Sequence, residues 1–248
     1  MRQLKHDSLD WKSYYTTHTT TARAAVRAAV HDGAHLVFGH AVAAPESIAE
    51  ALFLEREHFR DLTIFHMLYF ATPWHLRPEM GGHARGRLNF LDKHSRPVVR
   101  EGRADFVPCH FHEVPRLFRE GLYPVDIAAV QLSPPNAEGY CSLGVSCDYT
   151  KAAIEEAKVI IAEVNEQMPF IAGDNLVHVT ELDYIIPVDR PLTEIPQPEI
   201  GEVERRIGEV CAALIHDGDT LQIGIGAIPD AVLQCLGDRK DLGLHTEM

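Results

Sequence analysis

The chain contains 248 residues, of which 46% are hydrophobic, and carries a formal net charge of −13 at pH 7. Its length allows one large or two ordinary globular domains. The negative charge excludes a general nucleic-acid or anionic-membrane surface, so an anionic ligand would have to be held by local backbone N–H groups and a few basic side chains.

The cysteines indicate a reducing compartment, and the hydropathy of the sequence indicates no membrane segment. The five cysteines form no Cys-x-x-Cys pair and leave an odd number, which favours a cytosolic protein over a disulfide framework. The N-terminal sequence MRQLKHDSLDWKSYY has no apolar signal core, and no apolar run approaches membrane-spanning length. We therefore expect a cytoplasmic protein with no membrane partner.

The first third of the chain predicts a strand, a turn, a helix and a second strand. Thr21 can cap an alanine-rich helix over residues 22–30. A strand over residues 35–38 leads through a turn to Pro45, which opens a helix with one apolar face, and the next strand covers residues 61–67. This order of elements is typical of α/β proteins with parallel strands.

Three segments in the middle of the chain carry less specific patterns. Residues 81–87, GGHARGR, are expected to form a flexible basic loop that is either solvated or in contact with an anion. Residues 109–112, CHFH, do not have the spacing of a zinc site, so we expect no metal there. Residues 133–140 have turn chemistry that suits a hairpin or a substrate-facing loop equally.

The C-terminal stretch predicts the same order of elements around a glycine turn. A short strand over residues 220–223 leads into the turn 224–226, Gly-Ile-Gly, and a helix is expected over residues 230–236 with Pro229 in its first turn. The glycines allow positive φ and close approach to the backbone. The turn therefore presents free N–H groups at a helix N-terminus, which favours phosphates and developing oxyanions.

A further strand begins at Asp241 and leads to Glu247. Because both strands of a βαβ crossover run the same way, the turn and Glu247 are expected at the carboxyl edge of the sheet, where open α/β sheets bind ligands. The residues alone leave simpler interpretations open, namely an ordinary βα turn and a solvated rim glutamate. The stretch lacks the third glycine of a dinucleotide fingerprint and the Lys and Ser/Thr of a P-loop.

Two stretches repeat each other at an offset of 185 residues. HDGAHLVFGHAVAAPESIAEAL begins at His31 and HDGDTLQIGIGAIPDAVLQCL begins at His216, followed by DLTIFHM and DLGLHTE respectively. When the two stretches are aligned, we interpret one extra residue in the turn of the first copy as the only gap between them. The repeat predicts two domains of one topology: an N-terminal domain over 1–190, a proline-rich linker over 191–200, and the start of a second domain over 201–248.

The two copies differ at the positions that matter for chemistry. The second copy has the Gly-Ile-Gly turn and Glu247, whereas the first has Gly39-His40-Ala41 and places His66 or Met67 at the corresponding strand end. This asymmetry predicts that the chemistry belongs to the second copy.

Seven motifs occur in order between about Gly33 and Met248: FGHA, GRADFVP, HEVPRLFREG, QLSPPNAEGYCSLGVSCDYTKAAIEEAK, AEVNEQMP, GIGAIPDAVL and HTEM. Together they resemble the acetyl-CoA hydrolase/transferase family, in particular its 4-hydroxybutyrate and butyryl-CoA:acetate CoA-transferase branch. The resemblance implies an α/β fold of duplicated, open parallel-sheet CoA-transferase (NagB/RpiA-like) domains, with the second copy truncated in this chain.

The resemblance also implies site residues and substrates. Glu247, in the His-Thr-Glu-Met motif and 23 residues after Gly224, would be the nucleophile. The substrates would be an acyl-CoA (acetyl-, butyryl- or 4-hydroxybutyryl-CoA) and a short-chain carboxylate such as acetate, with no tightly bound cofactor and no metal. Coenzyme A would be contacted by the GIGAI stretch, that is, by Gly224, Ile225, Gly226, Ala227 and Ile228.

Members of the family are nearly twice as long as this chain, which implies that a further glycine-rich loop for CoA and the oxyanion is missing. We therefore expect a homo-oligomer or a partner that supplies the missing C-terminal half, and no nucleic-acid partner. Two alternatives stay open. One is an acyl-CoA hydrolase that admits water to the same site, and the other is an inactive fragment that needs a partner half.

Overall fold

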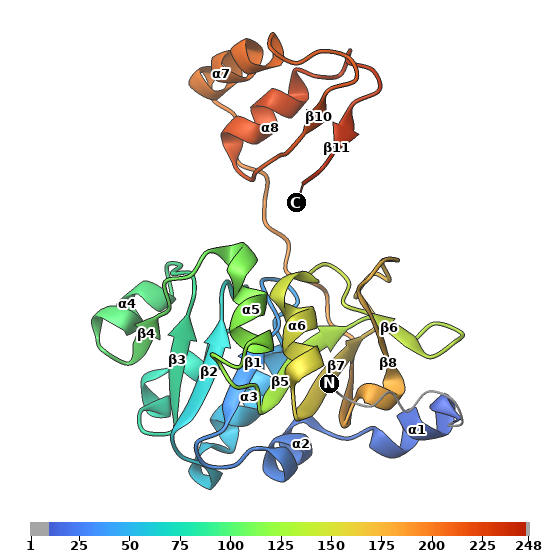
Figure 1. The fold of residues 1–248 in the computed structure, drawn as a ribbon. Coiled ribbons are helices and arrows are strands. Elements are labelled where there is room, and N and C mark those ends of the chain that lie inside the picture. Colours follow the sequence, from blue (N-terminus) through green and yellow to red (C-terminus); the bar gives the residue numbers. More distant parts are fainter. Residues whose placement is uncertain (1–9, 247–248) are drawn as a thin grey trace. The chain divides into compact units, whose positions relative to one another are not determined.

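The structure, a computed structural model, describes residues 10–246. The chain divides into two compact units, residues 1–193 and residues 194–248 (Figure 1). Within the described range, no helix has both the length and the apolar character needed to cross a membrane.

Seven parallel strands form the central sheet of the first unit, in the order β4-β3-β2-β1-β5-β7-β9 (Figure 1). The strand order changes direction at β1, because β2 pairs with one side of β1 and β5 with the other. The expected parallel α/β sheet is confirmed. The strands are β1 His35–Phe38, β2 Leu62–His66, β3 Ala84–Leu88, β4 Ala104–Phe106, β5 Ile127–Leu132, β7 Val159–Asn165 and β9 Tyr184–Val188.

Helices cover both faces of this sheet, because its central strands are apolar on both sides. Val37 and Val130 face a core that includes α5 and α6, whereas Leu36 and Phe38 face a second core that includes α2 and α3. The helices are α1 Trp11–His18, α2 Ala22–Ala29, α3 Glu46–Leu54, α4 Ser95–Arg100, α5 Val114–Arg119 and α6 Asp148–Glu156.

Short elements complete the first unit. In the turn of residues 133–140, Asn136 accepts hydrogen bonds from the backbone of Glu138 and Tyr140. The turn leads into β6, which pairs antiparallel with β8. These strands are β6 Tyr140–Ser142 and β8 Leu176–His178, and the 3₁₀ turns are η1 Arg56–His58, η2 Trp74–Leu76, η3 Pro78–Met80, η4 Phe111–Glu113 and η5 Val179–Glu181.

The expectation of a flexible basic loop at residues 81–87 is wrong. Ala84–Leu88 forms strand β3 between β2 and β4. Asp105 on β4 accepts hydrogen bonds from Arg85 at 2.7 and 2.5 Å and pairs with Arg87 at 2.6 Å. A carboxylate on the neighbouring strand thus offsets the basic charge, which allows this polar sequence to pair near the edge of the sheet.

The second unit contains two helices and two short parallel strands, α7 Glu202–Ala212, β10 Thr220–Leu221, α8 Ala227–Gln234 and β11 Gly243–Leu244. Residues 191–200 between the two units have no regular secondary structure. The strand expected over 220–223 is shorter than predicted. The helix expected over 230–236 begins three residues earlier, because Gly226 takes the N-cap position and Pro229 fits the third helical position.

The strand pairs of the two copies have the same register. His35 lies opposite Thr63 in the first unit, and the equivalent residues Thr220 and Gly243 lie opposite each other in the second. The duplicated strand, turn, helix and strand is therefore present in the structure as well as in the sequence.

The turns that lead into these strands are also equivalent. Gly33 donates to Arg60 O at 2.9 Å and Gly218 donates to Lys240 O at 3.0 Å. Asp61 and Asp241 both take positive φ, 59° and 57°, a region that Asp adopts more readily than most residues. Such shared backbone detail supports duplication of one unit.

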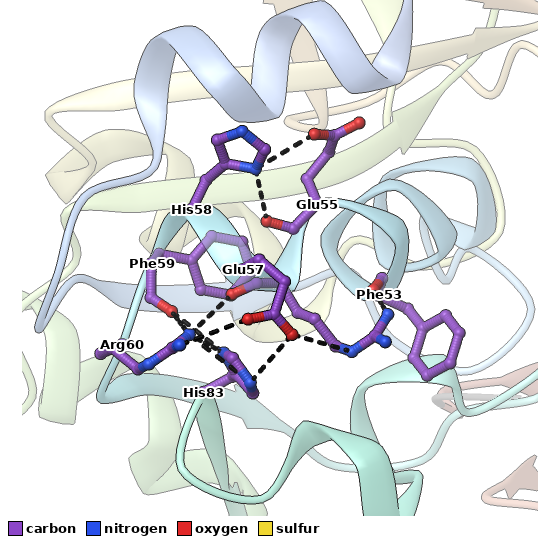
Figure 2. Close-up of polar contacts among 8 residues, drawn as sticks. Phe53, Glu55, Glu57, His58, Phe59, Arg60 and His83 are labelled. Atoms are coloured by element: carbon purple, nitrogen blue, oxygen red, sulfur yellow. Dashed lines mark hydrogen bonds and ion pairs between the residues drawn. The ribbon is translucent and has the colours of Figure 1, made fainter.

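The single gap that we inferred between the copies is wrong. The connection from helix to strand is also longer in the first copy, Phe53–Arg60 against Gly237–Lys240. The additional residues form η1, where Glu57 lies 3.3 Å from Arg60 and 3.7 Å from His83 (Figure 2). Insertions in surface connections are tolerated well, so the gap leaves the register unchanged.

Close packing of α7 on α8 leads to a stability prediction. A Cβ added at Gly208 would lie 2.7 Å from Ala231 O, in the backbone of α8. We expect Gly208→Val to destabilise the second unit by about 1–3 kcal/mol, measured as faster hydrogen exchange in α7 and α8. Gly201→Ala is the control, because its Cβ meets only the end of the Glu204 side chain. The prediction would be contradicted if the amides of α7 and α8 were equally protected from hydrogen exchange in both variants.

Candidate functional site

The glycine turn of the second unit has a backbone conformation that only glycine adopts readily. Gly226, the N-cap residue of α8, has φ 119° and ψ 177°, in a region that is essentially restricted to glycine. A Cβ on Gly226 would meet no atom of residues 10–246 within 4 Å. The space beside the turn is therefore open, and the requirement for glycine comes from the backbone.

The same turn leaves backbone N–H groups free at the start of α8. Helix geometry gives the first residues, Ala227 and Ile228, no intrahelical acceptor, and no side chain in the described part of the chain caps this end. Pro229 has no N–H, and Asp230 donates to Gly226 O at 3.2 Å. Two neighbouring N–H groups, at the positive end of the helix dipole, thus suit an anionic group.

The end of the neighbouring strand is held beside this turn. Ile223 N donates to Thr246 Oγ1 at 3.1 Å, and the Thr246 hydroxyl donates to Ile223 O at 2.8 Å. This reciprocal pair places Thr246 next to the residue that precedes the glycine turn. Glu247, the predicted nucleophile, follows Thr246 in the sequence but lies outside the described residues.

An apolar cavity of about 220 Å³ adjoins the turn within the second unit. Gly224, Ile228 and Pro229 contribute to its wall, together with apolar side chains of β10 and α8. Ile225, at the tip of the turn, is 67% exposed. The turn therefore combines free N–H donors with an apolar surface, as expected for a site that binds a ligand with both anionic and apolar parts.

The equivalent helix of the first unit already has an anion at its N-terminus. Glu163 on β7 is fully buried and accepts a hydrogen bond from Ile48 N near the start of α3 at 2.9 Å. Arg190 donates to the other carboxylate oxygen at 2.8 Å. Burial raises the pKa of Glu163, whereas Arg190 and the Ile48 N–H favour its charged form. This internal carboxylate explains why the first copy offers no comparable anion site.

A histidine and aspartate pair in the first unit was missed by the sequence analysis. His40 follows β1, and its Nδ1 lies 2.6 Å from Asp148 at the start of α6. The pKa of Asp148 is raised by burial, but hydrogen bonds from His40 and Ser146 outweigh this effect and hold it below its usual value. The two residues are 108 positions apart in the sequence, so the sequence does not show that they pair. The only signal for a functional role was the position of His40 in the turn after the first strand.

The carboxylate fixes the ring orientation of His40. Because Asp148 accepts from Nδ1, the proton of neutral His40 lies on Nδ1 and Nε2 is an acceptor. Nε2 is buried and has no hydrogen-bond partner among residues 10–246. The first unit therefore presents one oriented imidazole nitrogen at the carboxyl end of β1, able to make one further hydrogen bond.

A second buried pair joins β2 to η2. The Nε2 atoms of His66 and His75 lie 2.9 Å apart, so one ring donates and the other accepts. Burial lowers the pKa of His66 to about 4 and that of His75 well below its usual value. This pair forms part of the core beneath Tyr69 and Phe38.

These lowered pKa values predict an acid-sensitive fold. In the unfolded chain a histidine takes up a proton near pH 6.5, whereas folded His66 does so only near pH 4. Stability should therefore fall as the pH drops from about 6.5 towards 4, by about 3 kcal/mol for His66, measured by urea unfolding at several pH values. His66→Gln should make this dependence shallower. If the unfolding free energy of that variant depended on pH as steeply as that of the wild type, His66 would not be the source of the pH dependence.

Other sequence features do not form a metal site in the structure. Among residues 10–246, no group of three or more His, Cys, Asp or Glu side chains is arranged to hold a metal ion. His110 and His112 stack on each other with ring centres 5.7 Å apart, and η4 begins at Phe111 between them.

The sequence matches a family model over most of its length. The acetyl-CoA hydrolase/transferase N-terminal domain model matches residues 1–195. The chain is 45% identical to the 4-hydroxybutyrate coenzyme A transferase of Clostridium kluyveri over 240 residues, which cover 97% of this chain and 56% of that protein. These matches confirm the resemblance inferred from the sequence motifs.

Solved structures agree with the sequence matches. The 4-hydroxybutyrate CoA-transferase of Porphyromonas gingivalis superposes with a TM-score of 0.84 at 49% identity and covers 96% of this chain and 56% of that one. RipA of Yersinia pestis superposes with a TM-score of 0.91 at 32% identity over 96% of this chain and 57% of that chain. This chain spans about half the length of the curated relatives it matches. It belongs to the acetyl-CoA hydrolase/transferase family.

Proposed function

We propose that this chain carries the nucleophile and part of the coenzyme A site of a CoA-transferase. The enzyme moves CoA between an acyl-CoA and a free short-chain carboxylate. The main support is the uncapped start of α8, where the amides of Ala227 and Ile228 follow a glycine-only turn, together with Thr246 beside that turn. Glu247, the next residue, is the proposed nucleophile.

In the proposed mechanism the enzyme alternates between a free and a CoA-bound carboxylate. A Glu247 oxygen attacks the thioester carbonyl carbon of acyl-CoA, the C–S bond breaks, and CoA thiolate leaves a mixed anhydride. The thiolate then attacks the Glu247 carbonyl carbon, which releases the first carboxylate and forms a glutamyl-CoA thioester. An acceptor carboxylate reverses the two steps. Covalent catalysis divides a difficult exchange between weak nucleophiles into easier steps.

The proposed CoA contacts are Gly224, Ile225, Gly226, Ala227 and Ile228. Free N–H groups at the start of α8 can stabilise negative charge that develops on a thioester oxygen, an effect worth about 3 kcal/mol per donor. The apolar cavity beside Gly224 and Ile228 suits an apolar part of the substrate. Binding of groups remote from the reacting carbon supplies energy that positions the thioester.

The proposed substrates are those in the names of similar CoA-transferases. One relative is named a butyryl-CoA:acetate CoA-transferase and another a 4-hydroxybutyrate coenzyme A transferase. We therefore propose acetyl-, butyryl- or 4-hydroxybutyryl-CoA as donor and acetate as acceptor, with no tightly bound cofactor and a cytoplasmic location. Hydrolysis of acyl-CoA is the second candidate, because the family model also includes hydrolases.

An acceptor assay separates transfer from hydrolysis. Butyryl-CoA is incubated with the enzyme, with and without acetate, and both acetyl-CoA and free CoA are measured. Transfer predicts acetyl-CoA that appears only with acetate, at the rate at which butyryl-CoA is consumed. Release of free CoA at the same rate with and without acetate would instead identify a hydrolase. Both functions would be rejected if none of acetyl-, butyryl- and 4-hydroxybutyryl-CoA were consumed, either by this chain alone or by this chain mixed with the second half of a relative.

We also propose that another polypeptide covers the second unit in the active enzyme. Val203 and Val210 on α7 are 66% and 68% exposed, and Leu244 on β11 is 68% exposed. Two strands cannot bury both faces of a sheet. The proposed partner is a homologous C-terminal half or a second copy of this chain, so the activity assay uses this chain both alone and mixed with the second half of a relative.

A further inference from the structure

A second cavity lies entirely within the first unit. It has a volume of about 430 Å³ and is lined by residues at the starts of β2 and β3, including Leu62 and Ala84, and by residues around η2 and η3. Since these strands are parallel, their starts lie at the opposite edge of the sheet from His40, which follows the end of β1. The volume falls within the usual range of about 300–1,000 Å³ for small-molecule sites.

The cavity wall contains an arginine that has no ionic partner. Arg77 forms no ion pair with any residue from 10 to 246, and its guanidinium carbon lies 3.8 Å from the ring centre of Trp74. Stacking of this kind holds a guanidinium in place while its edge remains able to donate hydrogen bonds. The guanidinium also lies 5.2 Å from the ring centre of Phe53. Arg77 is therefore a cation that two aromatic rings hold in place, on a residue that lines the cavity.

Two further arginines line the same cavity. Arg103 is held by a hydrogen bond to Leu76 O at 2.7 Å and by its pair with Glu101. Arg85 pairs with Asp105, but the same carboxylate also serves Arg87, so one negative charge faces two positive ones. Asp61 is the only carboxylate among the residues that line the cavity within the described range. The lining therefore has an excess of positive charge.

We propose that this cavity binds a small organic anion with at least two negatively charged oxygens, such as a polycarboxylate or a phosphate ester. Arg77, which has no ion pair among the described residues, can donate two hydrogen bonds to one oxyanion. Arg85 and Arg103 already donate to Asp105, Glu101 and backbone carbonyls, so they add positive charge at the cavity wall. The volume favours an organic molecule over inorganic phosphate, which would fill only part of it. The site is separate from the Gly224 turn and does not depend on the proposed CoA-transferase reaction.

Calorimetric titration of the full chain tests this site with citrate, glucose 6-phosphate and inorganic phosphate as probes. We expect at least one organic anion to bind more tightly than inorganic phosphate. Arg77→Gln should raise its Kd at least about tenfold, as expected for loss of a charge-assisted hydrogen bond. Arg100→Gln is the matched control, because it removes the same charge from an exposed position on α4 that does not line the cavity.

A second measurement uses only the wild-type chain, so the test does not depend on how a variant folds. Phenylglyoxal modifies accessible arginines, and mass spectrometry locates the modified residues. A bound anion should protect Arg77 and leave Arg100 reactive. The proposal would be overturned if none of the probes bound, if both variants weakened binding equally, or if Arg77 and Arg100 were protected to the same extent.

Discussion

Glu247→Gln should lower CoA transfer by at least about a thousandfold in the active enzyme, whether this chain acts alone or with a complementary half. The amide keeps the size of the side chain but cannot form the mixed anhydride by attack of a carboxylate oxygen. The free amides of Ala227 and Ile228 are unchanged in this variant. The variant should therefore lose turnover but keep its affinity for CoA. Steady-state transfer and CoA binding are measured on the same preparation.

Two further measurements sharpen the test of the nucleophile. Glu156→Gln removes an exposed carboxylate from α6 in the first unit and should leave transfer unchanged. Hydroxylamine trapping after incubation with acyl-CoA should modify Glu247, as located by peptide mass spectrometry. If Glu247→Gln kept turnover within about tenfold of wild type, a barrier change of only about 1.4 kcal/mol, Glu247 would not be the nucleophile.

The parallel fold was predictable because local patterns agree with the tertiary structure. Thr21 accepts a hydrogen bond from Ala24 N and caps α2, and β1 occupies the predicted residues 35–38. Short apolar strands, turns and helices alternate along the chain, which favours parallel pairing with helices on both faces. Because the sequence repeats, the same order of strand, turn, helix and parallel strand could be predicted for the second unit.

Features that depend on distant contacts could not be predicted in this way. Strand β3 contains Arg85 and Arg87 and has the composition of a loop, but Asp105 on the next strand pairs with both arginines and offsets part of their charge. Likewise, Asp148 orients His40 across 108 sequence positions. Sequence periodicity reports which face of an element is apolar, and it does not report which charged residues meet after folding.

The sequence distinguishes the two copies by the Gly-Ile-Gly turn of the second, and the assignment of the chemistry to that copy stays a prediction. The structure adds a physical difference between the copies. Glu163 supplies the start of α3 with a buried carboxylate, whereas no side chain of the described residues caps the start of α8. An anion can therefore compete for the second helix N-terminus without displacing an internal partner.

Gly226→Val should weaken CoA binding at least about tenfold, because the valine backbone cannot adopt φ 119° and ψ 177° without strain. Relief of that strain would move the start of α8 and misalign the amides of Ala227 and Ile228. The added side chain would also occupy open space beside the turn, where no atom lies within 4 Å of the position that a Cβ would take. Calorimetric titration with CoA measures this effect without requiring turnover.

Gly237→Ala is the matched control for Gly226→Val. Gly237 lies beyond the other end of α8, its Cβ would meet no atom within 4 Å, and it is not among the glycines with positive φ. We therefore expect Gly237→Ala to bind CoA as tightly as wild type, while hydrogen exchange in α7 and α8 shows that both variants keep the second unit folded. If Gly226→Val left CoA affinity unchanged in such a folded unit, CoA would not be held at this turn, and the anion site at the start of α8 would need a different ligand.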